Sequence, residues 1–585
     1  MKNYFFLGLL FISSMVLAQE REISGTITDA EGLPLIGVNI IIEGTNRGTQ
    51  SDFDGNYSIV ADEGQVLVYS FVGFSPEKRT VGTQSVINVN LSADNTLEEV
   101  VVVGYGTQSK RKVTDNISSI SADEINNIPV ANMQSALVGK AAGVQITQIN
   151  GKVEGGVKMR VRGVASISSS LEPLYVVDGM PLINDDESTS EAPINPLISI
   201  NPNDIESIEI LKDASSAAIY GARGTNGVVL ITTKQGRAGK TTVSINTSSG
   251  WSRPTNKVEW LNAEEYIMLM QEASAYTYGS DDEWLIEEDG YFDWMANGLD
   301  WRNGAVDTDW QDYALVDGAV QDHTVSVSGG NDKTRFFLSG GYNRTEAIIR
   351  GNDLERYSIR SNIDHDVSER LSVGFNSGIS KTHISRIGTD NSFSTPLQAV
   401  AQSPISPAYL EDGIIPNNES TIYYNFLMQE YNGDWDSNIF RVLINTYAQY
   451  ELLPGLNFRT EVGYDNNNQT EEYFAGSMTE SASTNGYADA NAVQSDKYNL
   501  NNYFNYSTTF AEDYDLDLVL GMSFEESTRS RQYTAVPNFL QMIFKQWQVL
   551  RKLSTEFLPG PSTTFSPILV GQHSPCLTNT FSKEV

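Results

Sequence analysis

The chain of 585 residues is too long for one ordinary domain, so we expect several. It carries 74 acidic and 39 basic residues, a formal net charge of -35. A field of that sign repels nucleic acid and anionic lipid headgroups, which argues against both as electrostatic partners. The single cysteine, Cys576, excludes an intrachain disulfide framework and a cysteine-rich metal cluster.

The first residues, MKNYFFLGLLFISSMVLAQ, have the order of a secretory signal. Lys2 precedes an apolar stretch, and small side chains come just before the expected cut between Ala18 and Gln19. We therefore predict a signal peptide at 1–18, with a buried helix or short membrane anchor as the alternative. Because no later apolar run reaches about 20 residues, we expect an exported chain without a helical anchor.

Two short regions follow the predicted signal. Residues 22–92 alternate apolar and polar positions in runs such as EISGTIT and NYSIV, separated by turn residues, which predicts a compact β-sandwich. In the turn DFDGN, Asp52 and Asp54 lack the further ligands of a calcium loop, so a hairpin turn explains them better. Residues 93–112 place two glutamates directly before four valines and end in three basic residues, as a linker would.

Residues 113–236 mix short helices with strands and predict a small α+β domain. Ser121 and Glu124 have the spacing of a capping box at a helix start. From 240 to 536 the pattern alternates with period two, as in LNFRTEVGY and LDLVLGMSF. We count about ten such segments of roughly 9–11 residues, the length that crosses a bilayer when tilted. Short turns and long polar loops (383–437 and 475–495) alternate between them, which favours an outer-membrane β-barrel over a soluble sandwich.

Four stretches together resemble the SusC/RagA family of TonB-linked outer-membrane transporters from Bacteroidetes. They are EEVVVVGYGTQSKRKVT, VRGVASISSSLEPLYVVDGMP, IESIEILKDASSAAIYGARGTNGVVLITTKQG and TDWQDYALVDGAVQDHTVSVSGG. The resemblance implies a mainly β chain: a carboxypeptidase-regulatory-like β-sandwich at 22–92, an α+β plug at 113–236, and an incomplete antiparallel transmembrane β-barrel at 240–536. The carboxypeptidase label refers to a fold and implies no peptidase activity.

The resemblance also implies sites and partners. The segment of Glu99, Val100, Val101, Val102 and Val103, in the linker 93–112, matches the TonB box, an exposed strand that pairs with an energy-coupling protein; a strand of the sandwich or plug is the alternative. Family motifs of the plug are carried by Arg160, Arg162, Gly163, Asp178, Gly179, Asp213, Tyr220, Gly221, Arg223, Gly224 and Gly227. Structural roles are expected for them more than substrate contact, with the arginines facing carboxylates of the barrel lumen.

The implied function is TonB-dependent import of an oligosaccharide or peptide with a SusD-like lipoprotein. The implied location is the cell outer membrane, with the N-terminal module in the periplasm. The four scattered histidines have no zinc spacing, and the chain has neither a G-x-S-x-G elbow nor a P-loop. We therefore expect no enzyme, catalytic residue, metal or cofactor. The competing hypothesis is an exported β-rich binding protein or adhesin, which would need neither plug nor valine segment.

Residues 537–585 differ in composition from the rest of the chain. They contain no aspartate, only two glutamates and the lone cysteine, and period-two alternation disappears. Family members continue for several hundred residues and close a barrel of roughly 22 strands. The sequence therefore predicts an out-of-frame tail near Pro537 and a truncated product, inactive if its unpaired strand edge stays in the membrane.

Overall fold

The computed structural model describes part of the chain. It covers residues 582–584 and residues 21–537 except 30–31, 46, 72–73, 75, 92–99, 104–105, 110–116, 127–132, 149–150, 165–170, 185–186, 189–192, 279–282, 288, 389–396, 480–485 and 511–513. The predicted signal peptide and its cleavage site, Ala18–Gln19, lie outside the described residues, as does most of the predicted tail. The chain forms two compact units, residues 1–101 with 108–113 and residues 102–107 with 114–585.

The first unit holds a two-sheet β-sandwich, as the sequence predicts. Its sheets have the strand orders β4-β1-β7 and β3-β2-β5-β6. Gly25 on β1 lies against the backbone of Ile87, where a Cβ would come within 1.9 Å of the carbonyl oxygen, so only glycine fits there. The strands are β1 (Arg21–Thr28), β2 (Asn39–Ile42), β3 (Gly48–Gln50), β4 (Asn56–Ala61), β5 (Val66–Ser70), β6 (Glu77–Thr80) and β7 (Val89–Asn90).

The valine segment forms a strand in a two-stranded sheet. Strand β8 (Val100–Val103) pairs with β9 (Gly106–Ser109), which comes directly after it in the chain. Glu99 lies outside the described residues. The valines thus adopt the extended conformation that strand addition to a partner requires.

A small α+β domain, here called the plug, comes next. Its five-stranded sheet has the order β10-β15-β16-β13-β14, and β11 pairs with β12. One half of the predicted capping box is present, because Glu124 Oε1 accepts a hydrogen bond from the backbone N of Ser121 at 3.4 Å. The Oγ of Ser121 also donates to Glu124 Oε1, at 3.3 Å. The elements are β10 (Ile117–Ser121), α2 (Ala122–Asn126), α3 (Met133–Ala136), β11 (Val144–Gln148), β12 (Val157–Val161), β13 (Leu174–Val177), β14 (Met180–Pro181), η2 (Pro202–Asp204), β15 (Ile205–Leu211), α4 (Ala214–Ala217), η3 (Ala218–Asn226) and β16 (Val228–Thr233).

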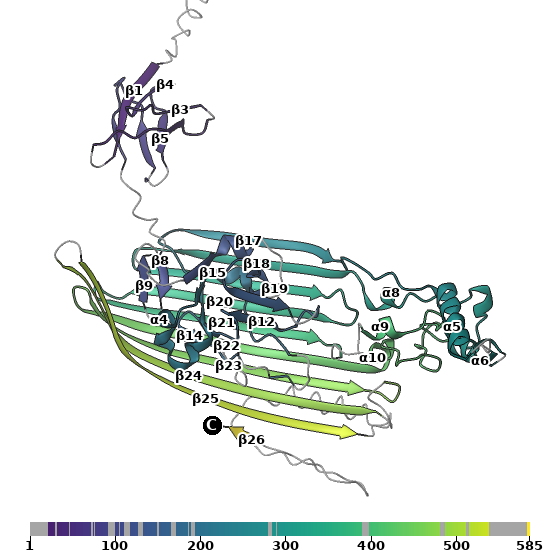
Figure 1. Cartoon of the computed structure of the whole chain (residues 1–585). Coiled ribbons are helices and arrows are strands. Elements are labelled where there is room, and N and C mark those ends of the chain that lie inside the picture. The colour runs from purple at the N-terminus through teal and green to yellow at the C-terminus, as the bar shows by residue number, and fades with distance from the viewer. Residues whose placement is uncertain are drawn as a thin grey trace, which may run out of the picture. The chain divides into compact units, whose positions relative to one another are not determined.

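One large antiparallel sheet, here called the wall, carries the plug on one face (Figure 1). Each strand pairs with the next in chain order, and within the described residues β17 pairs only with β18, so the sheet is open. The strands are β17 (Gly239–Ser252), β18 (Gly318–Gly330), β19 (Thr334–Glu346), β20 (Asp353–Asp366), β21 (Leu371–Ser385), β22 (Gly433–Leu453), β23 (Leu456–Ala475), β24 (Tyr487–Phe510), β25 (Tyr514–Pro537) and β26 (Ser582–Glu584), of which β26 belongs to the predicted tail.

The wall buries polar side chains against the plug and exposes apolar side chains on its other face, the reverse of the arrangement in a soluble protein. On β20 the polar side chains Arg356, Ser358, Arg360 and Asn362 are buried against the plug. Between them Tyr357, Ile359 and Ile363 are exposed, Ile359 to 63 %. Strand β25 likewise exposes Leu518, Leu520, Met522 and Phe524, which alternate along one face. An apolar outer face around a polar interior is the pattern of a transmembrane β-barrel wall, so the alternation was interpreted correctly.

The predicted strand lengths and loops need correction. Strands β18 to β25 have 13 to 24 residues where 9–11 were predicted. Residues 433–437 and 487–495, predicted as loop, belong to β22 and β24. The backbone pairing of these strands continues beyond the length that crosses a bilayer. The side chains in these extensions are polar, so the extensions resemble loops in sequence.

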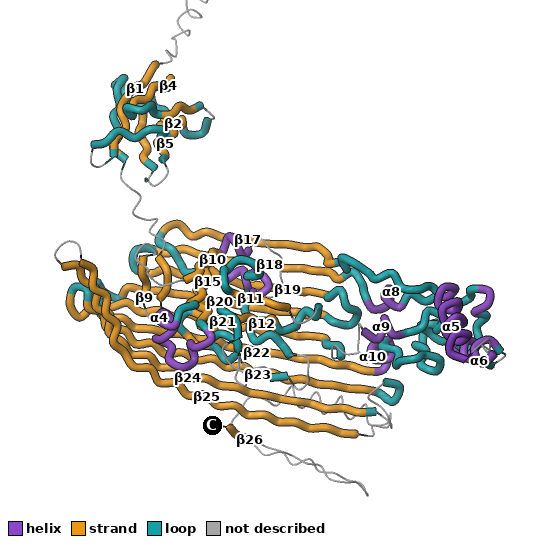
Figure 2. The backbone as a smooth tube through the Cα atoms, in the orientation of Figure 1, coloured by secondary structure: helices purple, strands orange, loops and turns teal. Residues whose placement is uncertain are grey.

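The predicted barrel region also contains helices, which the sequence reasoning missed. They are α5 (Ala263–Tyr278), α6 (Glu283–Ile286), α7 (Tyr291–Met295), η4 (Trp301–Asn303), α8 (Trp310–Ala314), α9 (Leu397–Ala401) and α10 (Leu427–Asn432). Figure 2 shows them gathered beyond one end of the wall strands, in the connections β17–β18 and β21–β22. Among the helices described, none is both long and apolar enough to cross a membrane.

Candidate functional site

The interface between plug and wall begins at a tight turn of the plug. Asp178 and Gly179 join β13 to β14 with φ of 48° and 87°, the paired positive values of a type I′ hairpin. The turn directs Asp178 toward β16, where its carboxylate accepts hydrogen bonds from Thr233 N (2.9 Å) and Thr233 Oγ1 (2.7 Å). Arg360 of the wall donates to the same carboxylate through Nη1 at 3.2 Å.

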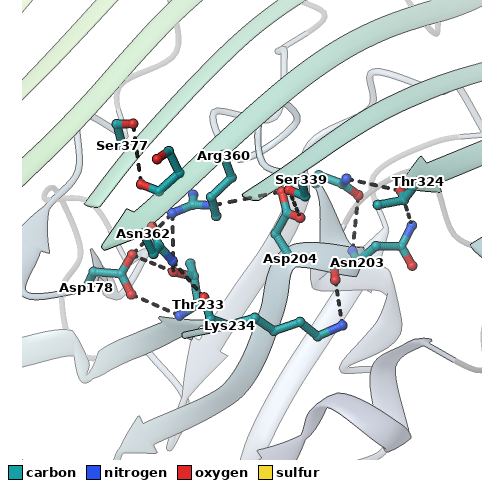
Figure 3. A network of polar contacts seen from close by, with 12 residues as sticks. Asp178, Asn203, Asp204, Thr233, Lys234, Thr324, Ser339, Arg360, Asn362 and Ser377 are labelled. Carbon is teal, nitrogen blue, oxygen red and sulfur yellow. Dashed lines mark hydrogen bonds and ion pairs between the residues drawn. The ribbon is translucent and has the colours of Figure 1, made fainter. Parts of the chain in front are cut away.

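Arg360 lies between two carboxylates of the plug (Figure 3). Its Nε is 3.8 Å from Asp204 Oδ2, in the short helix η2, while Ser339 of the wall donates to Asp204 Oδ1 at 2.6 Å. Burial raises the pKa of Asp204 above its usual range, although the positive charge of Arg360 acts in the opposite direction. Asn362 on the same strand donates to Thr233 Oγ1 and to the Lys234 carbonyl, both at 2.8 Å.

A second arginine of the wall holds the plug through its backbone. Arg441 on β22 makes a bidentate pair with Asp465 on β23, with N–O distances of 2.9 and 2.7 Å. The same guanidinium donates to the plug carbonyls of Pro196 (2.8 Å) and Ile183 (2.9 Å). Asp465 in turn accepts from Ile183 N at 2.9 Å. The pair therefore recognises main-chain groups of the plug and is satisfied on both sides.

A third cluster joins the plug to the connection after β21. Glu154 of the plug accepts from Asn352 Nδ2 at 2.7 Å, and its other oxygen lies 3.6 Å from Arg386 Nε. Arg386 also pairs with Glu471 of β23 and lies over the Trp435 ring, 4.5 Å from its centroid. The charged side chains of this cluster are fully buried, so the contact replaces the hydration that each would have in water.

The last wall strands provide a fourth cluster. Glu187 of the plug accepts from Ser495 Oγ at 2.9 Å and pairs with Arg529 of β25 at 2.5 Å. Arg223 of the plug pairs with Glu525, also on β25, and Lys497 of β24 lies 3.2 Å from the same carboxylate. The plug is thus held by charged contacts from β20 to β25.

The three plug arginines that were expected to face carboxylates of the barrel lumen differ in their partners. Arg223 faces a wall carboxylate, as expected, but Arg162 pairs with Asp213 of the plug itself at 2.5 Å. The expectation of a lumen carboxylate was wrong for Arg162, because its positive φ of 58° before Gly163 turns the strand end back toward α4. Arg160, on β12, lies opposite Gln145 and near Glu172, both in the plug.

The remaining motif residues shape the plug. Tyr220 is buried in a hydrophobic cluster with Leu174 and Val228. Gly221 has a φ of 62° at a kink, and Gly227 has a φ of 89°. Gly224 lies so close to Ala217 that a Cβ would come within 2.5 Å of its carbonyl oxygen. Each of these positions contributes to a turn or to close packing within the plug.

Sequence reasoning missed the wall residues that grip the plug: Arg356, Arg360, Asn362, Arg386 and Arg441. A signal existed, because Arg360 and Asn362 alternate with exposed apolar residues such as Ile359 and Ile363. Their partners lie more than 120 residues away in the chain, so only the fold brings them together. Among the residues that the structure describes, no group of three or more His, Cys, Asp or Glu side chains could hold a metal ion.

The contacts described above can hold one domain in place against another. Removing one partner from a buried ion pair typically costs about 3–5 kcal/mol because the other charge stays buried. Several such contacts act in parallel here, so thermal motion alone would rarely free the plug. A pulling force applied at one end could break the contacts in sequence.

Comparisons with known proteins agree with this architecture. The family described as TonB-dependent Receptor Plug Domain matches residues 109–228, and the CarboxypepD_reg-like domain matches 23–103. "TonB-dependent receptor P3" of Formosa agariphila is 32 % identical, over 97 % of this chain and 53 % of that protein. "TonB-dependent receptor SusC" of Bacteroides thetaiotaomicron is 35 % identical, over 60 % of this chain and 33 % of that protein.

Solved structures show the same fold. A structure entitled "Structure of the RagAB peptide importer in the 'open-open' state" superposes with a TM-score of 0.66 at 22 % identity. The match covers 83 % of this chain and 53 % of that chain. The chain spans about half the length of the curated relatives it matches over most of its length.

Proposed function

The chain belongs to the SusC/RagA family of TonB-dependent receptors, and from this premise we propose that it imports a nutrient across the outer membrane. The observation that carries the proposal is the plug, held on the polar face of the wall by buried ion pairs such as Arg360–Asp178. An adhesin would need a wall or a binding surface, but no domain fixed by breakable polar contacts inside it. Transport by plug displacement needs both the wall and a plug that is held to it by breakable contacts.

The orientation in the membrane follows from the connections. Barrels of the outer membrane have short turns on the periplasmic side and long loops outside. Residues 331–333, 367–370 and 454–455 are short turns at one end of the wall strands, whereas 253–317 and 386–432 are long connections at the other. We therefore place the helices α5 to α10 on the cell exterior and the N-terminal module in the periplasm, after export by the signal peptide 1–18.

Energy would enter through the valine segment. We assign Glu99–Val103 as the TonB box, where an energy-coupling protein adds a strand, and the extended conformation of β8 supports this assignment. Pulling at this point acts on the chain directly before the plug. The mechanical work would break the plug contacts one cluster at a time, and no covalent bond of the substrate would change.

Partners and substrate belong to the same proposal. A SusD-like lipoprotein would capture an oligosaccharide or peptide outside and deliver it to the wall interior. Support for this comes from the family and from the similarity to SusC and to a structure of the RagAB peptide importer. The helical connections beyond the wall strands would be the parts of this chain nearest to such a partner.

The first experiment asks whether the chain forms a closed wall in the outer membrane. Membranes are fractionated after expression, and the detergent extract is run on a gel with and without boiling. A folded barrel stays compact until boiled, so a band that shifts on heating in the outer-membrane fraction supports the proposal. A chain that is degraded or periplasmic, with no shift, argues against import by this chain.

The second experiment tests energy coupling without knowledge of the substrate. In a Cys576→Ser background, Ser339→Cys places a thiol on the wall beneath the plug, where Ser339 is 7 % exposed. Maleimide labelling in energised cells, fed a mixture of peptides and oligosaccharides, is compared with labelling after a proton uncoupler. Faster labelling that is lost with the uncoupler and after deletion of 99–103 supports the mechanism. Labelling that is independent of both contradicts it.

A further inference from the structure

The helix α5 has two faces of different character. Its inner row, Ala263, Ile267, Met270 and Ser274, packs into a hydrophobic cluster with α6, α7 and Trp301. The helix starts with a capping box, in which Asn262 Oδ1 accepts from Glu265 N at 2.9 Å and Glu265 Oε2 accepts from Asn262 N at 3.1 Å. The cap and the packed row fix the helix, so its outer face is a rigid surface.

The outer face carries an ordered row of side chains. Glu264, Met268, Glu272 and Tyr276 follow one another at intervals of four residues, which places them along one side of the helix. Met268 is 57 % and Tyr276 92 % exposed, and the neighbouring Leu269 is 51 % exposed. Carboxylates and large apolar groups therefore alternate along a strip of solvent-facing surface, here called the α5 strip.

Large apolar side chains are also exposed on α6 and α7, which pack with α5 in the same hydrophobic cluster. Trp284 and Trp294 are each 45 % exposed, and both pack on Tyr291 with ring centroids 5.5 and 5.9 Å apart. Exposed indole faces of this kind attract cations as well as apolar groups. Several large apolar side chains exposed within one small group of helices are a common mark of an interaction site.

The charge around the α5 strip indicates what it accepts. Residues 263–316 contain fourteen acidic residues and one basic residue, Arg302. Arg302 already pairs with Asp293 at 3.0 Å and lies over the Trp301 ring. A ligand that brings positive charge and apolar side chains is therefore complementary, while an anionic polysaccharide is repelled.

We propose that the α5 strip is a docking surface for cationic peptides, bound in extended form with basic and apolar side chains alternating on one side. This inference rests on the proposed import function and narrows its substrate class to peptides of positive charge. It concerns capture at the outer helices, before passage through the wall.

The geometry of an extended peptide matches the α5 strip. Residues four apart on a helix are separated by about 6 Å along the axis. Side chains two apart on an extended peptide lie on one side, about 6.7 Å apart. A lysine, an apolar residue and a second lysine at alternate positions can therefore contact Glu264, Met268 and Glu272 in order. A neutral sugar chain could stack on the aromatic rings but would gain nothing from the carboxylates.

The test measures binding to the detergent-solubilised full chain, without transport. The probe is the fluorescein-labelled peptide Gly-Lys-Gly-Leu-Gly-Lys-Gly, and binding is followed by fluorescence anisotropy at 20 and 300 mM salt. Its counterpart has glutamate in place of both lysines, and a linear glucose hexasaccharide is the neutral competitor. We compare Glu264→Gln/Glu272→Gln with the control Asp332→Asn/Glu369→Gln, two exposed acids in short turns at the other end of the wall.

The expected result is binding of the lysine peptide only, weakened by high salt. The α5 double variant should weaken it about fivefold, on the order expected for the loss of two exposed ion pairs, and the control variant should leave it unchanged. Absence of binding overturns the inference, as does equal binding of the glutamate peptide, displacement by the hexasaccharide, or an equal effect of both variants. Because the binding test involves no energy source, its failure would not contradict the import proposal. Conversely, a chain that binds the lysine peptide but does not import would support the docking surface and contradict the import proposal.

Discussion

The guanidinium of Arg360, on a wall strand, lies 3.2 Å from the carboxylate of Asp178, in a hairpin turn of the plug, and both side chains are 6 % exposed. The two residues are 182 positions apart in the chain. In the proposed mechanism, this contact joins a domain that moves to a wall that stays in place. Its strength therefore bears on both stability and transport.

Replacing Arg360 with alanine should loosen the plug without unfolding the wall. Asp178 and Asp204 would keep hydrogen bonds from Thr233 and Ser339 but lose their shared cation in a buried site. We expect a loss of about 3–5 kcal/mol in the free energy that holds the plug. Hydrogen exchange of residues 205–233, followed by mass spectrometry, measures it.

The matched control is Arg335→Ala. Arg335 also lies on the wall and pairs with a carboxylate, Asp366 at 3.3 Å, but both side chains are 34 % exposed. An exposed pair is worth about 0–1 kcal/mol, so exchange of the plug should barely change. Equal effects of the two variants would show that burial of the Arg360 pair is not what holds the plug.

Asp204 should make plug attachment depend on pH. Burial raises the pKa of its carboxyl in the assembled state above the value in the unfolded chain. Its contribution to stability is therefore fully present below the ordinary aspartate pKa and is lost as pH rises through the raised value. Wild-type plug attachment should therefore strengthen as pH is lowered from the alkaline range toward the ordinary pKa of aspartate.

Asp204→Asn removes this titration while keeping an oxygen that can accept from Ser339 Oγ, now at 2.6 Å. The pH dependence of the denaturant midpoint for plug release should flatten in this variant. Asp332→Asn, an exposed acid in a wall turn, should keep the wild-type profile. A wild-type plug that is held more tightly at alkaline pH than near the ordinary aspartate pKa would refute the sign of the effect.

The alternation of β20 shows how much the sequence could tell. Because strand side chains point to opposite faces, the order of residues alone separates Tyr357 and Ile359 from Arg360. The face on which Arg360 lies could be inferred from the rule that lipid accepts apolar groups. Its partners could not, since Asp178 and Asp204 are brought to it by the fold of a separate domain.

The arginines of the plug show the same limit. Arg162 and Arg223 look alike in their motifs, yet one pairs within the plug and the other with Glu525 of the wall. Sequence pattern determines which side of a local element a residue occupies, but not which distant element covers it. The helices in 253–317 were missed for another reason. The sequence has a capping box at Asn262 and Glu265, but it lies in a region whose overall pattern predicts strands.

The N-terminal module offers a test of hydrogen-bond direction. Tyr57 donates its hydroxyl proton to the Ile87 carbonyl at 2.8 Å, so the 2.6 Å contact between the Tyr57 and Tyr69 hydroxyls has Tyr69 as donor. Tyr57→Phe leaves the Tyr69 donor and the Ile87 carbonyl unpaired and should cost about 1–3 kcal/mol. Tyr69→Phe leaves only a spare acceptor on Tyr57 and should cost clearly less.

Hydrogen exchange of β1 and β4 in the full chain ranks these two variants. Both remove a single hydroxyl from rings in edge-to-face contact, with centroids 5.5 Å apart, so the difference in packing is small. If Tyr69→Phe proved the more damaging, the donor assignment would be reversed.

Acid should weaken the helical connection outside the wall at Asp293. The carboxylate accepts from Trp301 Nε1 at 2.5 Å and from Arg302 Nη1 at 3.0 Å, and the hydrogen bond from Trp301 is the main reason that its pKa lies below the usual range. Since the pKa is depressed in the folded state, this stability is present above the ordinary aspartate pKa and is lost as pH falls through the depressed value. The site is partly exposed, so we expect an effect of about 1 kcal/mol or less.

The Trp301 indole N–H signal, assigned by its loss in Trp301→Phe, reports this change in a titration from pH 6 to pH 2.5. The signal should move toward the position of a weaker hydrogen bond as the carboxyl is protonated. Trp310 provides the control within the same connection, because its indole donates at 2.9 Å to the Ser403 carbonyl, which does not titrate. Parallel shifts of both signals would indicate general acid unfolding of the connection, whereas a shift of Trp301 alone localises the titration to Asp293.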